Sequence, residues 1–302
     1  MWFIYTLATT LLWGLAELFY KKGARPTEKY AHLKTCVCVG GVMGLHALFM
    51  LATQDISYDP VNIVRYLPVS LLYIVSMGCS YFGMRFIEES ISDPIENTSG
   101  ALCTVLCVLI LGEEISRGSL LAIGVIVIGI LGIGFLEHYG KTDRKRKIGR
   151  KLALLAFAMP FFYAILDAVG SFLDIYYLDI ATSPLAGITE DNIEAVANTS
   201  YELTFALCAV GIYGFLHTKK VHFNLPAQGD KLLAAVCETA GQFTYVYAMS
   251  GNGAIAAPVI SSVCMVSLIL SRIFLKEKLT WLQYLFIAMI IGGIVILAYI
   301  EG

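Results

Sequence analysis

The sequence predicts an all-α integral membrane protein whose ten transmembrane helices form two inverted five-helix repeats. Three observations carry this prediction: an apolar composition, ten long apolar runs, and a match between the two halves of the chain. Of the 302 residues, 58% are hydrophobic and 15% are charged, whereas soluble domains contain roughly 45–50% and about 25%. The composition is therefore typical of a membrane protein.

Each of the ten apolar runs is long enough to span a bilayer. A helix that crosses a hydrocarbon core of about 30 Å needs roughly 20 mostly apolar residues. The spans must be helical, because lipid offers no partner to an unpaired backbone polar group. In chain order, the predicted spans are residues 3–22, 33–53, 66–87, 94–112, 118–138, 152–178, 197–217, 230–250, 254–275 and 280–300.

The second half of the chain repeats the first. One constant shift along the chain aligns residues 93–116 with 257–280, and a slightly smaller shift aligns residues 11–18 with 161–168. Because each repeat contains five spans, an odd number, the two repeats must insert with opposite topology. Inverted repeats of this kind are typical of secondary transporters, which bind their substrate near the bilayer midplane between the halves.

The repeats predict two domains, residues 1–140 and 152–302, joined by the basic linker 141–151. All lysines and arginines except Arg65 and Arg117 lie in or beside the connections that follow odd-numbered spans. Loops rich in these residues stay cytoplasmic. We therefore expect a multi-pass protein of the plasma membrane with both termini on the extracytoplasmic side. The net charge of −2 gives no reason to expect a nucleic acid as partner.

Short motifs in both halves carry a resemblance to a known family. They are "LLWG" at residues 11–14, and Glu113 and Glu277, which close spans four and nine in "LILGEEIS" and "IFLKEKLT". On these motifs the chain resembles the ten-helix EamA-type members of the drug/metabolite transporter superfamily. The resemblance implies inverted repeats around a central cavity, alternating access, a small organic substrate and no covalent chemistry. It also implies cytoplasmic termini, whereas the charge distribution predicts the reverse.

Several carboxyl and aromatic residues lie inside the predicted spans. A charge at the centre of an isolated span costs about 2.5–3.5 kcal/mol on insertion scales, so a carboxyl group there points to a function. Helical spacing of three or four residues then identifies neighbours on the same face. The predicted substrate-binding residues are Trp13, Glu17, Tyr81, Glu96, Asn97, Tyr163, Asp167, Glu238, Gln242 and Tyr245.

An acid beside an aromatic ring, repeated on several helices, favours an organic cation as substrate. Ring faces attract a cation by about 0.5–2 kcal/mol, and a carboxylate neutralises its charge. Glu17 and Asp167 occupy equivalent places in the two repeats and are the predicted proton-coupling residues. Competition of cation and proton for one carboxylate would produce exchange or proton-coupled transport.

Two alternatives remain open. The first is a carrier of a neutral or zwitterionic metabolite, such as an amino acid. The second, from a different class, is an intramembrane receptor, scaffold or enzyme, which is disfavoured. An intramembrane protease would need a GxGD-type or HExxH motif, which the chain lacks, and a receptor or scaffold would not require several buried acids. No lysine or arginine lies deep in a predicted span, which argues against phosphorylated cargo. The oligomeric state is not predicted.

No cofactor or metal is expected. The chain has no Walker sequence, and no cysteine pair lies near a histidine at ligand spacing. The eight cysteines all fall in apolar runs, where they behave as small hydrophobic residues. Three further polar residues receive structural interpretations. Tyr20 is predicted to lie at the lipid–water interface, His46 to be a packing histidine, and Glu202 is left open between an interfacial and a functional role.

Overall fold

The computed structural model describes residues 1–23, 28, 30–54, 56–83, 86, 95–140, 150–274 and 279–301. Five predicted features lie wholly or partly outside these residues: residues 141–149 of the predicted basic linker, Glu277, the end of predicted span three at residues 84–85 and 87, the start of span four at residue 94, and the end of span nine at residue 275.

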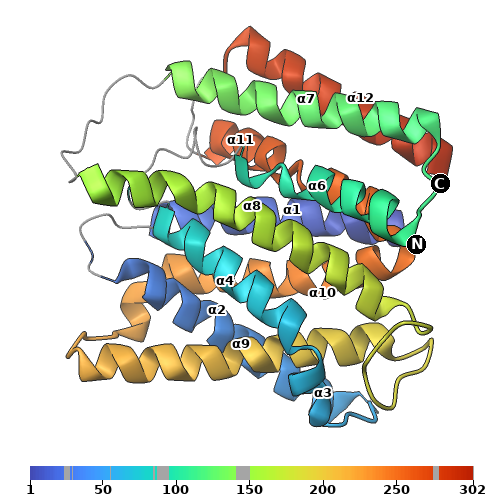
Figure 1. The fold of residues 1–302 in the computed structure, drawn as a ribbon. Helices are drawn as coiled ribbons and strands as arrows, with labels where there is room; N and C mark the ends of the chain where they lie inside the picture. Colours follow the sequence, from blue (N-terminus) through green and yellow to red (C-terminus); the bar gives the residue numbers. More distant parts are fainter. Residues whose placement is uncertain are drawn as a thin grey trace.

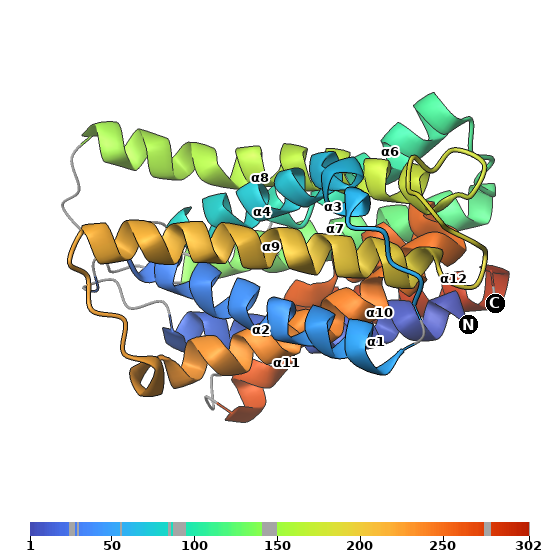
Figure 2. The same cartoon turned by 90° about the horizontal axis from the view of Figure 1, so that it is seen from below.

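All regular secondary structure in the described residues is helical. In chain order, the helices are α1 (Trp2–Gly23), α2 (Ala31–Thr53), α3 (Val61–Arg65), α4 (Leu67–Gly83), α6 (Ser99–Leu106), the π-helical η1 (Cys107–Leu111), α7 (Arg117–Gly140), α8 (Arg150–Leu178), α9 (Ile193–Thr218), the 3₁₀ helix η2 (Leu225–Gln228), α10 (Gly229–Ile260), α11 (Val263–Phe274) and α12 (Trp281–Glu301). The long helices run roughly alongside one another, and both chain ends lie at the same end of the bundle (Figures 1 and 2).

Six of these helices, α1, α2, α7, α8, α9 and α12, are long and apolar enough to cross a membrane. A seventh candidate is the segment Leu225–Ile260 followed by α11, which is bent by 51° at residues 261–262. The structure thus has six or seven candidate spans where the sequence predicts ten. The remaining predicted spans fall on α4 and on α6 with η1, which are apolar but shorter.

Predicted spans eight and nine meet at a sharp break inside α10. Asn252 has a non-helical backbone, with φ −163° and ψ 68°, so α10 consists of two helical pieces joined at this residue. The sequence alone suggests a connection here because Gly251 and Gly253 flank the asparagine. In the fold, the helix breaks at this place, and the two glycines allow Trp2 and Ile175 to pack closely beside the break.

Helices from the two halves of the chain pack in pairs. α1 packs on α10, α2 on α9, α4 on α8, and α7 on α12. The pair of α7 and α12 lies at one edge of the bundle (Figure 1). A Cβ atom on Gly129 of α7 would lie 2.6 Å from Ile290, and one on Gly293 of α12 would lie 2.6 Å from Ile126. Small residues at these points let the two helices approach closely, as is usual in membranes.

A cluster of charges ties the segment after α1 to α2 and α10. Lys34 and Lys231 donate hydrogen bonds to Glu28 over 2.5 and 3.1 Å. Lys231 is only 2% exposed and also donates to Gln228 over 2.7 Å. Partial burial raises the pKa of Glu28, but the two ammonium groups outweigh this and hold the pKa below its ordinary value.

Glu28→Gln is expected to lower the thermal stability at neutral pH and to flatten its pH dependence in acid. Since the pKa of Glu28 is depressed in the fold, the ionised carboxylate stabilises the fold above the ordinary glutamate pKa of about 4.3. This stabilisation is lost as the pH falls through the lower folded pKa. Melting temperatures of the parent and the variant in detergent, from about pH 7 down to about pH 3, measure the difference. The exposed Glu114→Gln variant serves as control, and identical pH profiles for the parent and Glu28→Gln would contradict the prediction.

Candidate functional site

A cavity of about 130 Å³ opens between α1, α4, α8 and α10 and the segment before α6. This volume is roughly ten times the 10–15 Å³ that holds one water molecule by the same measure, so a small organic molecule fits. A second cavity of about 50 Å³ adjoins it, with Trp13, Tyr73 and Asp167 among the residues that line both. Together, these two spaces form the candidate site.

All ten residues predicted from the sequence line this site. Tyr245 lines the smaller cavity, and the other nine line the larger one: Trp13, Glu17, Tyr81, Glu96, Asn97, Tyr163, Asp167, Glu238 and Gln242. The structure therefore brings together residues from both halves of the chain. Their role in substrate binding stays a prediction.

The four carboxyl groups reach the cavity from different elements. Glu17 lies on α1, Asp167 on α8 and Glu238 on α10, while Glu96 lies just before the turn that precedes α6. Ser80 donates a hydrogen bond to Glu96 over 2.8 Å.

Asp167 lies close to the beginning of a helix. Asp167 lines the smaller cavity together with Ser99, the first residue of α6. The unpaired N–H groups at a helix N-terminus carry a partial positive charge, which stabilises a negative group nearby. The broken fourth span therefore provides a favourable place for a carboxylate inside the bundle.

Aromatic rings lie between these acids. Trp13 stacks on Tyr245 with ring centroids 5.1 Å apart, and its indole N–H donates to the Glu238 carbonyl oxygen over 3.3 Å. Tyr20 donates to the Glu238 carboxyl group over 3.4 Å, and Tyr81 donates to the Tyr20 hydroxyl over 2.8 Å. The wall of the cavity thus alternates ring faces with carboxyl groups.

The interfacial assignment of Tyr20 is wrong. Its side chain is 7% exposed and lines the larger cavity. Although Tyr20 lies near the end of α1, it shares the face of Glu17 three residues earlier, and that face is turned toward α4 and α10. Helix ends predict an interfacial tyrosine only when the residue points toward lipid, and the sequence does not show that direction.

Sequence reasoning missed six other residues that line the larger cavity: Lys21, Tyr73, Met77, Ser80, Tyr201 and Val263. Two signals could have found some of them. Tyr73 and Met77 precede Tyr81 on α4 by eight and four residues, so they share its face, and Ser80 follows Met77 by three residues. Lys21 follows Glu17 by four residues, which places the two side chains on neighbouring turns.

Lys21 corrects the expectation that basic residues stay away from the cavity. Its ammonium group donates to the Ser267 hydroxyl over 3.0 Å and lines the cavity, although the residue belongs to the last turn of α1. A lysine stem is long enough to carry its charge away from its own Cα position. The site therefore contains a basic group alongside four acidic ones.

A second buried polar pair lies apart from the cavity, between α2 and α9. Glu202 is 0% exposed, and His46 Nδ1 lies 2.8 Å from each of its carboxyl oxygens. The sequence interpretations treated the two residues separately, because they lie far apart in the chain. Only the packing of α2 on α9 joins them.

In the part of the chain that the structure describes, no group of three or more histidine, cysteine or acidic residues could hold a metal ion. All eight cysteines are free thiols. The described site contains carboxyl, amide, hydroxyl, ammonium and aromatic groups.

Comparison with known proteins places the chain in a family. The model of the EamA-like transporter family matches residues 1–135 and 181–299. One solved crystal structure shares the fold, with a TM-score of 0.70 and 12% sequence identity over 100% of this chain and 99% of that chain. No significant match was found among curated proteins.

Proposed function

The chain belongs to the EamA-like transporter family, and from this premise we propose that it is a secondary active transporter of an amine or other small organic cation. The family consists of membrane transporters of small molecules rather than enzymes, and the apolar helices indicate a multi-pass membrane protein. We further propose that it lies in the plasma membrane with both termini outside.

The observation that carries the choice of substrate is the convergence of four carboxyl groups on one aromatic cavity. Glu17, Glu96, Asp167 and Glu238 line it, against the ammonium group of Lys21. Ionisation of even two of these acids leaves the cavity with a net negative charge. The faces of Trp13 and the surrounding tyrosines add attraction of about 0.5–2 kcal/mol for a bound cation.

Helix packing supports the proposal of two inverted repeats, residues 1–140 and 152–302. The repeat alignment equates α1 with α8 and α4 with α10, and the observed pairs are α1 with α10 and α4 with α8. A two-fold operation that exchanges the halves converts one of these pairs into the other. The contacts of Gly129 with Ile290 and of Gly293 with Ile126 are related by the same shift that aligns residues 93–116 with 257–280.

Breaks in two helices give further support. The turn at residues 97–98 precedes α6, and the turn at residues 261–262 precedes α11. The repeat alignment places the first turn on the second. Discontinuous helices that begin beside a central cavity are typical of transporters with inverted repeats. Asn97 and Val263 from these breaks both line the site.

We propose that transport proceeds by alternating access and is coupled to protons through Glu17 and Asp167. Both residues line the larger cavity and occupy equivalent places in the two repeats. If each carboxyl group binds either a proton or the cationic substrate, release of one allows binding of the other. The two ions then move in opposite directions without further machinery.

A zwitterionic metabolite such as an amino acid is the second candidate, because Lys21 lines the same cavity as the acids. In this case, Lys21 would bind the carboxylate of the substrate while Glu17 or Glu238 binds its amino group. A purely cationic substrate would make no favourable interaction with the Lys21 ammonium group and would be repelled by its charge. The two candidates therefore make opposite predictions for a Lys21→Met variant.

The test is uptake of labelled choline, a polyamine and a neutral amino acid into proteoliposomes, with and without a pH gradient. We expect gradient-driven uptake of a cation by the parent and a loss of about tenfold or more in Glu17→Gln and in Asp167→Asn, equivalent to at least about 1.4 kcal/mol. Glu114→Gln, an exposed acid outside the cavity, is the control and should transport normally.

Each other outcome is decisive. Unchanged uptake in Glu17→Gln and Asp167→Asn would contradict their role as coupling residues. Uptake of the amino acid alone, lost in Lys21→Met, would replace the cation by the zwitterion. Uptake of a cation that Lys21→Met leaves intact or increases would reject the zwitterion.

A further inference from the structure

The candidate site is separated by one helical turn from a third cavity at the other side of the bundle. Ser171 and Tyr245 line the smaller cavity of the site. Ile175 and Met249, four residues further along the same helices, line this third cavity, which is open and has a volume of about 810 Å³. At 3.6 residues per turn, the barrier along α8 and α10 is therefore a single turn thick.

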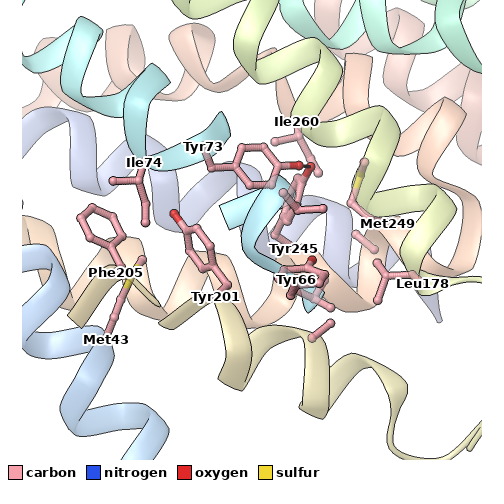
Figure 3. Close-up of a cluster of buried hydrophobic side chains, with 14 of the residues drawn as sticks. Met43, Tyr66, Tyr73, Ile74, Leu178, Tyr201, Phe205, Tyr245, Met249 and Ile260 are labelled. Carbon is pink, nitrogen blue, oxygen red and sulfur yellow. Dashed lines mark hydrogen bonds between the residues drawn. The ribbon is translucent and has the colours of Figure 1, made fainter. Parts of the chain in front are cut away.

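Three hydroxyl groups form the first part of this barrier. The hydroxyls of Tyr73 on α4 and Tyr245 on α10 lie 2.6 Å apart. Each also lies close to the Ser171 hydroxyl on α8, at 3.2 and 3.0 Å. All three side chains are buried. Figure 3 shows the rings of Tyr73 and Tyr245 meeting at the centre of the buried cluster.

A close contact between α8 and α10 forms the second part. A Cβ atom on Gly253 would lie 2.3 Å from the Ile175 Cγ1 atom. No larger residue fits there, so Ile175 packs directly on the backbone of α10 beside the kink at Asn252. This contact lies on the side of the hydroxyl layer that faces the third cavity.

Contacts at the end of α4 hold it to α8. Tyr66, which precedes α4, donates a hydrogen bond to the buried Asp174 of α8. Asn62 binds both the N–H and the C=O of Ala186 in the loop after α8, over 2.7 and 3.0 Å. α4 and α8 therefore form one unit, and the hydrogen bonds that join this unit to α10 within the layer all involve Tyr245.

The corresponding helices at the opposite end are less closely packed. The repeat alignment equates the α8–α10 pair with α4 and α1. Within the described residues, α1 and α4 make no helix contact as extensive as that of α8 with α10, and the two are linked by the hydrogen bond of Tyr81 with Tyr20. The barrier toward the third cavity thus includes a close contact of α8 with α10, whereas the described link between α1 and α4 is a side-chain hydrogen bond.

We propose that Tyr73, Ser171 and Tyr245, together with Ile175 on Gly253, form the closed gate of the substrate path. The substrate passes from the site into the third cavity when α10 separates from the α4–α8 unit. Acidic residues on that cavity, Glu113, Asp179 and Glu190, match the charge of the proposed cargo. The gate rests on the proposed transport function, but its opening can be measured without a substrate.

The first experiment measures opening by thiol labelling in proteoliposomes. Val263→Cys places a thiol of similar size in the site, and a charged, impermeant thiol reagent is added on the side of the third cavity. Tyr245→Phe removes the hydrogen bonds of Tyr245 in the layer while it keeps the ring on Trp13. We expect labelling of the thiol introduced by Val263→Cys to be about tenfold faster when Tyr245→Phe is also present, equivalent to about 1.4 kcal/mol.

The parent with Val263 retained serves as control for the native cysteines. Equal labelling rates with and without the Tyr245→Phe change would overturn the proposal that this layer closes the path. Because labelling needs no cargo, this result is independent of the choice of substrate. A protein that transports none of the probes but shows faster labelling would refute the proposed function and leave the gate intact.

The second experiment locks the gate in the full-length protein. Ile175→Cys and Gly253→Cys together place two thiols across the closed contact, where a disulfide can form. We expect oxidation to reduce uptake by the double variant about tenfold or more, and a reductant to restore it. The Ile175→Cys single variant and the reduced double variant are controls, and full uptake by the cross-linked double variant would overturn the gate.

Discussion

Gly100→Val is expected to abolish the folded transporter. A Cβ atom at this position would lie 2.3 Å from the Ser261 hydroxyl oxygen and 2.4 Å from the Ala257 carbonyl oxygen. Overpacking usually costs about 1–3 kcal/mol when side chains can move aside. Here one of the obstacles is the backbone of α10, so the two helices must separate as a whole.

Separation would also break the hydrogen bonds that join these helices. Gly100 N–H donates to the Ser261 hydroxyl over 3.1 Å, and Thr104 donates to the Ala254 carbonyl over 2.7 Å. Both contacts lie where the broken helix α6 crosses α10, next to the substrate site. Loss of these hydrogen bonds should therefore also displace Ser99 and Asn97, which lie beside the crossing of the two helices.

The yield of monodisperse protein in detergent and its thermal unfolding measure this effect. Gly124→Val is the matched control, because a Cβ atom at Gly124 meets nothing within 4 Å and the same change in helix propensity is made. Gly100→Ala should fall between the two. A Gly100→Val protein within about 0.5 kcal/mol of the Gly124→Val control would show that the helix crossing is looser than the structure indicates.

His46→Leu is expected to destabilise the protein by about 3–5 kcal/mol, the usual cost of leaving a buried charge without its partner. Glu202 is fully buried, and both of its carboxyl oxygens lie 2.8 Å from His46 Nδ1. This geometry suits an ionised carboxylate that accepts one N–H between its two oxygens. The histidine is 28% exposed, which lets its ring reach the edge of the bundle.

A double-mutant cycle with His46→Leu, Glu202→Leu and the double variant tests this interpretation. The double variant should regain most of the lost stability, because it removes both polar groups and keeps similar volumes. If the pair is instead a neutral hydrogen bond, each single change costs only about 0.6 kcal/mol, and at most about 1.7 kcal/mol, as in other membrane proteins. A measured loss in that range for His46→Leu would contradict the ion pair.

The residues of the candidate site could be predicted from the sequence because acids are rare and costly inside apolar spans. Glu17, Asp167 and Glu238 were found in this way, and helical spacing then led to Trp13 and Gln242 on the same faces. The structure places all of them on one cavity. The prediction succeeded because a carboxyl group inside an apolar span has a free-energy cost that a position at a polar cavity can offset.

Tyr73 and Tyr201 could not be predicted in the same way. A tyrosine in a membrane protein can lie in the core, at a cavity or at the lipid–water interface without the free-energy cost of a buried charge. Its presence in a span therefore does not indicate a site. Tyr20 illustrates the same difficulty, since its position near a helix end suggested lipid headgroups. Whether a tyrosine faces lipid or protein depends on the neighbouring helices.

The sequence by itself determined the helical membrane class, the family motifs and the acidic character of the site, because these depend on composition and on local spacing. Only the tertiary structure decided the partnership of His46 with Glu202 and the close approach of α8 to α10 at Gly253. The physical reason is the same in each case. These features arise from contacts between helices far apart in the chain, and such contacts leave no periodic signal in either helix alone.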